Sequence, residues 1–184
     1  MSAATRYRQL PSNARSIGFE LQTPSEVDVQ SVERGEVVVR CCERTADGKT
    51  VGELDVAMFR AALVIDRDGI LEEKVSTVAG DAAQPGARVL PPVPISLPGA
   101  TGYRAGVELV RQPLPYIYVF AIAPLDLGVD GGLLVTVRCA SPEWPAADSI
   151  LKSLRILGRR GASANDSHDE PPALPMAPLL GKRD

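Results

Sequence analysis

The sequence predicts a single α+β domain, in which a curved, mostly antiparallel β-sheet is flanked by a few helices and a C-terminal helix packs on the sheet. Strand-sized apolar segments recur between turn signals, and two segments have helical periodicity, the second of them after the last strand. The chain has 184 residues, 45% of them hydrophobic, which is enough for one substantial core. We expect an irregular N-terminal arm at 1–15, the domain at 16–158 and a disordered, Pro-rich tail at 159–184.

The first part of the domain is predicted to consist of strands. Apolar residues alternate with period two over 17–21, which is typical of a half-buried strand. A second strand is expected over 36–44, followed by a turn at the Asp-Gly pair 47–48, because this pair readily supplies the positive φ of a tight hairpin. Residues 54–65 are almost wholly apolar and fit a strand or a helix, and the β-branched pair at 64–65 favours the strand.

The middle of the chain mixes a helix with further strands. Residues 66–69 are expected to form a turn, and helical spacing over 70–79 predicts a short helix that Gly80 ends. The segment 81–98 is rich in proline, so we expect an edge strand or a loop there. Short connections predict antiparallel neighbours among the three strands that follow: 101–111, 115–123 and 132–140.

The C-terminal helix has clear start signals. Ser141 is the expected N-cap and Pro142 the first-turn proline. The helix should end near Arg155, with either Gly158 as its stop or a short strand at 156–157. Its apolar residues recur on one face of the helix: Trp144, Ala147, Leu151 and Leu154.

The residues that most enzymes need for acid–base chemistry are scarce. The one histidine, His168, falls in the predicted tail, so the domain has no imidazole for a Ser-His-Asp system, a Cys-His system or an HExxH zinc site. Cys41, Cys42 and Cys139 are an odd number without a CxxC pair, and we expect buried or half-buried free thiols. The sequence therefore predicts no enzyme, no cofactor and no metal site.

Net charge and hydropathy restrict the classes of partner and the location that we expect. The formal net charge of −3 disfavours nucleic acid, and the basic cluster of Arg155, Arg159 and Arg160 fits a helix end, where cations complement the dipole. No apolar run reaches the about 18 residues of a membrane span. The first thirty residues lack the apolar core of a secretory signal, so we expect a cytoplasmic location.

Aromatic residues on the late strands are the candidate partner-binding residues. They suit core packing or an interface about equally. They are Tyr103, Tyr116, Tyr118 and Phe120.

Two parts of the chain together resemble the PsbP-like superfamily, which includes photosystem accessory subunits and Mog-type, LpqN-type and DcrB-like proteins. One part is the strand over 17–21 with its stop at Pro24, and the other is the helix over 142–156 with its Ile-Leu-Lys-Ser-Leu phrase at 150–154. The resemblance covers about 16–157. It implies a curved antiparallel sheet flanked by helices. The members of the superfamily are mostly non-enzymatic, so the resemblance also implies a protein without catalytic activity. Some DcrB-like members are chaperones for effectors of bacterial type VI secretion.

Two classes of function follow from these observations. The first is a cytoplasmic adaptor or chaperone that binds another protein, for which a homodimer is one expected arrangement. The second is a structural or accessory subunit of a larger assembly, contacted through the arm at 1–15 and the tail at 161–184. Small-molecule binding remains a third, less favoured class.

Overall fold

A large antiparallel sheet lies at the centre of the structure, which is a computed structural model that describes residues 4–12, 15–32, 37–125 and 128–157. Its strands are Val27–Ser31 (β3), Val37–Arg44 (β4), Thr50–Phe59 (β5), Arg88–Leu97 (β6), Ala100–Glu108 (β7), Tyr116–Pro124 (β8) and Gly132–Cys139 (β9). The other elements are Thr5–Gln9 (β1), Gly18–Thr23 (β2), Arg155–Leu157 (β10), and the helices Arg67–Ala82 (α1) and Pro145–Ser153 (α2).

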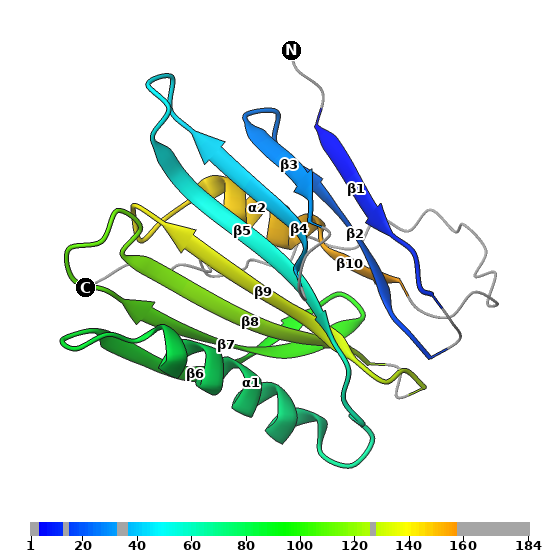
Figure 1. Cartoon of the computed structure of the whole chain (residues 1–184). Coiled ribbons are helices and arrows are strands. Elements are labelled where there is room, and N and C mark those ends of the chain that lie inside the picture. Colours follow the sequence, from blue (N-terminus) through cyan, green and yellow to red (C-terminus); the bar gives the residue numbers. More distant parts are fainter. Residues whose placement is uncertain (1–3, 13–14, 33–36, 126–127, 158–184) are drawn as a thin grey trace.

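The strands form two sheets in the described part of the chain. The seven-stranded sheet has the order β3-β4-β5-β9-β8-β7-β6, and the three-stranded sheet has the order β1-β2-β10 (Figure 1). Every pairing in both sheets is antiparallel. The predicted α+β class with a mostly antiparallel sheet is confirmed.

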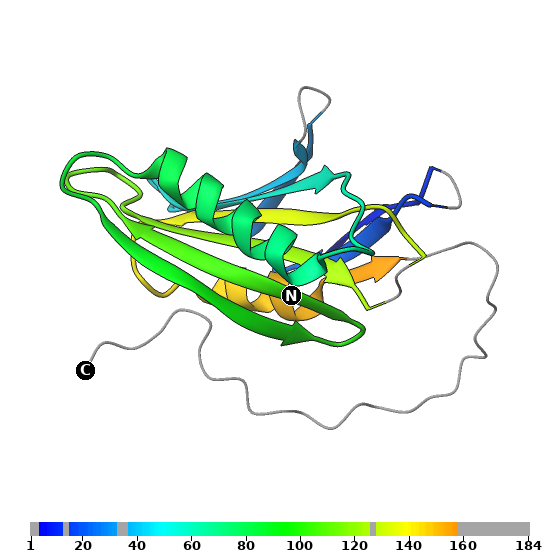
Figure 2. The same ribbon diagram turned by 90° about the horizontal axis from the view of Figure 1, so that it is seen from below.

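Side-chain alternation gives the large sheet two apolar faces, with one helix on each (Figure 2). Along β8, Tyr118 and Phe120 belong to a core that includes the buried residues of α2 and Phe19 of β2. Val119 and Ala121 point the other way, into a second core that includes the buried residues of α1. Strand β8 is therefore buried on both sides.

The ambiguous segment 54–65 is a strand only as far as Phe59, where β5 ends. The turn expected at 66–69 is wrong, because Asp66 is the N-cap of α1 and its Oδ1 accepts a hydrogen bond from the backbone N–H of Gly69 at 3.0 Å. Gly80 does not end the helix, which continues to Ala82. Ala79 is buried against the sheet, and this packing outweighs the low helix propensity of the exposed glycine.

Both ends of the domain differ from expectation. The arm at 1–15 is not irregular throughout, because Thr5–Gln9 forms β1 and pairs with β2. Helix α2 begins at Pro145 with Trp144 as its N-cap, not with Ser141. The indole of Trp144 is buried, and its residue has extended backbone angles, so the helix starts only after it. The predicted short strand at 156–157 is present as part of β10, while the tail at 159–184 lies outside the described residues.

The proline-rich segment forms β6, and β6 is an edge strand as predicted. Its pairing with β7 shifts register between Leu90 and Val93, on either side of a Pro-Pro pair. Proline has no N–H to donate to a neighbouring strand, which explains why this segment lies at an edge. Among the described helices, neither combines the length and the hydropathy that a membrane crossing requires.

Candidate functional site

Helix α1 covers only part of its face of the large sheet. It packs on β6, β7 and β8, and no described element lies over β4, β5 and β9 on the same side (Figure 1). The side chains on this side are those that alternate with the α2-facing core residues of the same strands. They define what we call the open face: Arg40 and Cys42 of β4, Glu53, Asp55 and Ala57 of β5, and Leu134, Thr136 and Arg138 of β9.

A groove of about 350 Å³ runs between α1 and the open face. Its lining is mainly apolar and comes from β5, β9 and one side of α1: Ala57, Phe59, Ile70, Val78 and Leu134, with Glu73, Lys74 and Thr77 from the helix as well. The ammonium of Lys74 lies 5.3 Å from the centroid of the Phe59 ring, a cation–π contact that holds both side chains at the rim.

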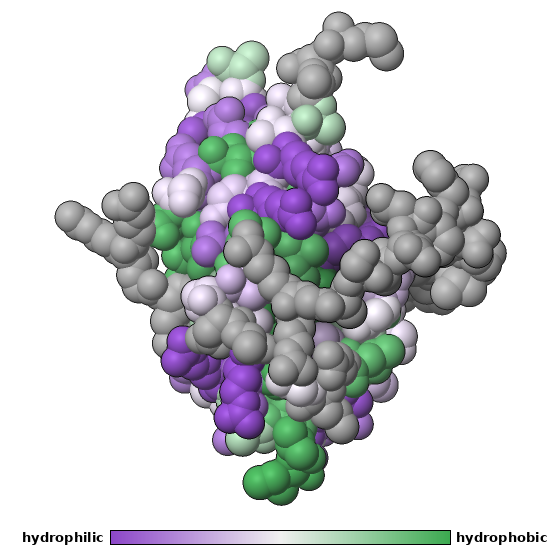
Figure 3. All heavy atoms as spheres, turned by 90° about the vertical axis from the view of Figure 1, so that its right-hand side faces the viewer, coloured by the Kyte–Doolittle hydropathy of each residue, from purple (hydrophilic) through white to green (hydrophobic). Residues whose placement is uncertain are grey.

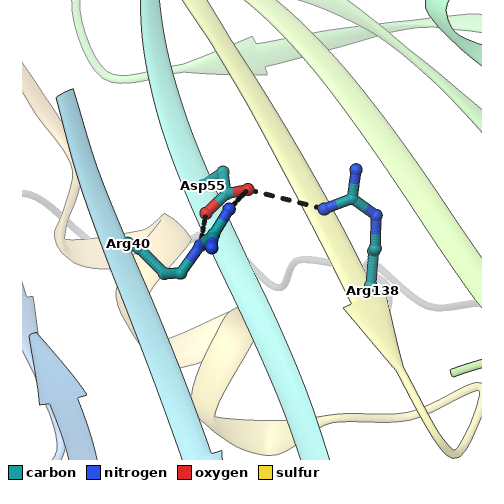
Figure 4. A network of polar contacts seen from close by, with 3 residues as sticks. All are labelled: Arg40, Asp55 and Arg138. Carbon is teal, nitrogen blue, oxygen red and sulfur yellow. Dashed lines mark hydrogen bonds and ion pairs between the residues drawn. The ribbon is translucent and has the colours of Figure 1, made fainter. Parts of the chain in front are cut away.

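A charged network lies on the open face beside the groove, because Asp55 is two residues from Ala57 on the same side of β5 (Figure 4). The Asp55 carboxylate accepts two hydrogen bonds from Arg40, from Nε at 2.7 Å and from Nη2 at 2.9 Å. Arg138 approaches the same carboxylate from β9, with Nη1 at 3.4 Å. The side chain of Asp55 is 8% exposed, so both arginines shield it from water.

The three charged side chains of this network hold one another in place. The hydrogen bond that Arg40 donates to Asp55, followed by the negative charge of Asp55, raises the pKa of Arg40, so the guanidinium stays ionised. Paired, bidentate contacts of this kind orient planar groups strongly. The open face therefore presents an apolar groove next to positively charged side chains whose positions are set by one buried carboxylate.

The described residues offer no group of three or more His, Cys, Asp or Glu side chains that could hold a metal ion. Cys41, Cys42 and Cys139 are free and buried, as the sequence predicts. Burial raises the pKa of the Cys41 and Cys139 thiols to about 12, and it also raises the pKa of Cys42 on the open face. A protonated, buried thiol is a poor nucleophile and a poor metal ligand.

These thiols give the fold an alkaline dependence. Because their folded pKa values lie above the ordinary value of 9.0, the unfolded state loses protons first as the pH rises above 9. Raising the pH to about 10 should therefore lower the free energy of unfolding by about 1 kcal/mol for each of Cys41 and Cys139. Urea unfolding followed by circular dichroism, at about pH 7 and at about pH 10, measures this loss. The loss should shrink in Cys41→Val, and an undiminished loss in this variant would contradict the assignment to the thiol.

The structure separates the four aromatic residues singled out in the sequence. Tyr116, Tyr118 and Phe120 lie on the α2 face of β8, where Tyr118 is 9% and Phe120 1% exposed. Burial raises the pKa of Tyr118 to about 12, and its hydroxyl donates to the carbonyl of Pro142 at 3.3 Å. Tyr103 packs on the opposite face, against the core that contains α1. Tyr118 and Phe120 are therefore core residues, which was the alternative interpretation.

No pattern in the sequence predicted the groove. Its walls come from β5 and α1, which follow each other in the chain, and from the distant strand β9, and only the register between β5 and β9 places Ala57 opposite Leu134. Ile70 and Val78 belong to the helical spacing that predicted the helix over 70–79, and both are only partly buried at the edge of the second core.

Comparison of the chain with models of known protein families found no match, and a search of curated proteins found no relative.

Proposed function

We propose that this chain is a non-catalytic protein-binding domain, an adaptor or chaperone, that holds a segment of another protein on its open face. The observation that carries the proposal is the mainly apolar groove of about 350 Å³ beside the ion-paired Arg40, Asp55 and Arg138. An apolar groove receives apolar anchor side chains, while charges at its border set the orientation of the bound segment.

The size and lining of the groove favour a short segment of a protein chain. Its volume is at the lower end of the about 300–1,000 Å³ typical of small-molecule pockets, and it is open along the sheet instead of enclosed. An amphipathic segment fits, with apolar residues in the groove, one carboxylate at Lys74 and others toward Arg40 and Arg138.

The resemblance to the PsbP-like superfamily suggests what the client is. Because some DcrB-like members are chaperones for type VI secretion effectors, we propose a secretion-system effector as the client class and the cytoplasm as the location. A homodimer, which would place two open faces in one particle, is part of the same proposal.

A structural or accessory subunit of a larger assembly is the second candidate. It is favoured by an apolar projection at the loop between β5 and α1, where Val64 is 62% and Ile65 90% exposed, and Figure 3 shows apolar residues at the lower end of this side. Exposed apolar residues at a loop tip are costly in a free monomer and common in permanent contacts.

The experiment is affinity purification of the tagged chain from its native host, followed by mass spectrometry of the proteins that copurify. Thr77→Arg should reduce recovery of a stoichiometric client by at least about tenfold, because it places a charged side chain in the groove. Ser76→Arg is the matched control: Ser76 is the preceding residue of α1, is exposed like Thr77 and does not line the groove. Both variants should keep the free energy of unfolding within about 0.5 kcal/mol of the parent.

The outcomes separate the two candidates. Loss of one client in Thr77→Arg and its retention in Ser76→Arg support the adaptor or chaperone. Recovery of a whole assembly that is insensitive to Thr77→Arg but lost in Ile65→Ser supports the subunit. A client that binds both arginine variants equally contradicts the groove as its binding site.

A further inference from the structure

The outer face of the small sheet is positively charged. Arg6 and Arg8 of β1 are two residues apart and so point to the same side, and both contact Glu20 of β2, at 2.6 and 3.7 Å. Arg155 of β10 is the cross-strand partner of Glu20 on the other side of β2, so a third arginine lies on this small sheet. Glu20 is the one acidic residue within the three strands of this sheet.

The excess positive charge faces solvent. The side chains of Arg6 and Arg8 are 58% and 54% exposed, and one carboxylate cannot satisfy the donors of both guanidinium groups. Arg155 donates from Nη1 to the carbonyls of Lys152 and Leu154, which fixes it at the end of α2 as the helix-end interpretation expects. Figure 3 looks onto this side of the molecule, and hydrophilic residues gather in its upper half.

Strand β1, which carries two of these arginines, is also an open edge. It pairs with β2 on one side, and no described strand pairs with its other side (Figure 1). The edges of the large sheet are less suited to an acidic strand. Edge strand β6 has prolines and a register shift, and β3 exposes Asp28.

We propose that an acidic, extended segment of a partner protein adds to the small sheet beside β1 and places its carboxylates against Arg6 and Arg8. Main-chain hydrogen bonds to the free edge would supply the register, and the alternate carboxylates of the added strand would meet the two arginines on one side of the sheet. This contact lies on a different sheet from the groove and does not depend on the function proposed for it. The formal net charge of −3 favours a protein segment over nucleic acid.

The test uses the full chain and a short fluorescein-labelled peptide in which glutamate alternates with threonine and valine, at about 150 mM NaCl. Fluorescence anisotropy should show binding, and the same peptide with glutamine in place of glutamate should bind at least about tenfold more weakly. Arg6→Glu/Arg8→Glu should weaken binding of the glutamate peptide by at least about tenfold. Arg44→Glu/Arg88→Glu changes the net charge equally at exposed arginines of the other sheet and should leave binding unchanged.

Amide hydrogen exchange tests strand addition separately. Bound peptide should slow exchange in β1 and leave the edge strands β3 and β6 unchanged. Equal weakening in both arginine double variants would overturn the site, and unchanged exchange in β1 would overturn the strand addition. An oligouridine or an anionic lipid vesicle that binds as tightly, with the same dependence on Arg6 and Arg8, would overturn the choice of partner. Binding of the peptide should persist in Thr77→Arg, which keeps this result separate from the groove.

Discussion

Replacing Trp144 by alanine should lower the free energy of unfolding by about 3–5 kcal/mol, the largest loss we expect from a single substitution. The indole is 2% exposed and lies in the core between the large sheet and α2. Its Nε1 donates to the Glu43 carboxylate at 2.5 Å, and this bond joins residues 101 positions apart in the sequence. The substitution removes the packing and leaves the carboxylate without its donor, so both effects act in the same direction.

Urea unfolding followed by far-UV circular dichroism measures this loss, and two further variants separate its causes. Gly52→Ala tests packing alone, because a Cβ there would lie 2.4 Å from a ring atom of Trp144, and it should also destabilise the fold. Trp144→Phe keeps much of the packing and removes the donor, so its cost should be smaller than that of alanine. A loss below about 1 kcal/mol for Trp144→Ala would contradict the central position of the indole in this core.

Asp55→Ala should cost about 2 kcal/mol, because it leaves Arg40 and Arg138 facing each other without the carboxylate between them. Removing one partner of a fully buried ion pair costs more free energy than this. The side chains of Arg40 and Arg138 are about 40% exposed, so water solvates their charges in part and lowers the cost. Thermal and urea unfolding at pH 7 should both show the loss.

Asp28→Ala is the matched control for Asp55→Ala. Asp28 is an exposed aspartate at the neighbouring edge strand β3, and its removal should change stability by less than about 0.5 kcal/mol. Arg138→Ala should cost less than Asp55→Ala, since its contact is longer and its side chain is partly solvated. Equal stability of the Asp55→Ala and Asp28→Ala variants would show that the network does not contribute to the stability of the fold.

Local patterns in the sequence predicted most of the elements. Period-two alternation is strong in β9, where every second residue is apolar, and it located this strand within a residue or two. The Asp-Gly pair predicted the hairpin between β4 and β5, and Gly48 has a φ of 83° there. Proline content placed β6 at an edge, because the missing N–H is a local property of the residue.

The features that local patterns missed depend on contacts between distant residues. Residues 5–9 have little apolar character and form a strand because β2 is available beside them. Trp144 was assigned to the stripe of a helix, whereas its hydrogen bond to Glu43 on β4 places it before the helix. For the same reason the network of Arg40, Asp55 and Arg138 could not be predicted, since it depends on the register of β4, β5 and β9.

The position of β8 between two cores decides the order in which the molecule opens under native conditions. All its residues except Tyr116 are buried, and its two sides pack on different helices. Its backbone groups pair with β7 on one edge and with β9 on the other, so we expect its amide protons to exchange only when these pairings and the two cores open together. We therefore expect β8 to exchange with solvent last, and the edge strands β1, β3 and β6 to exchange first.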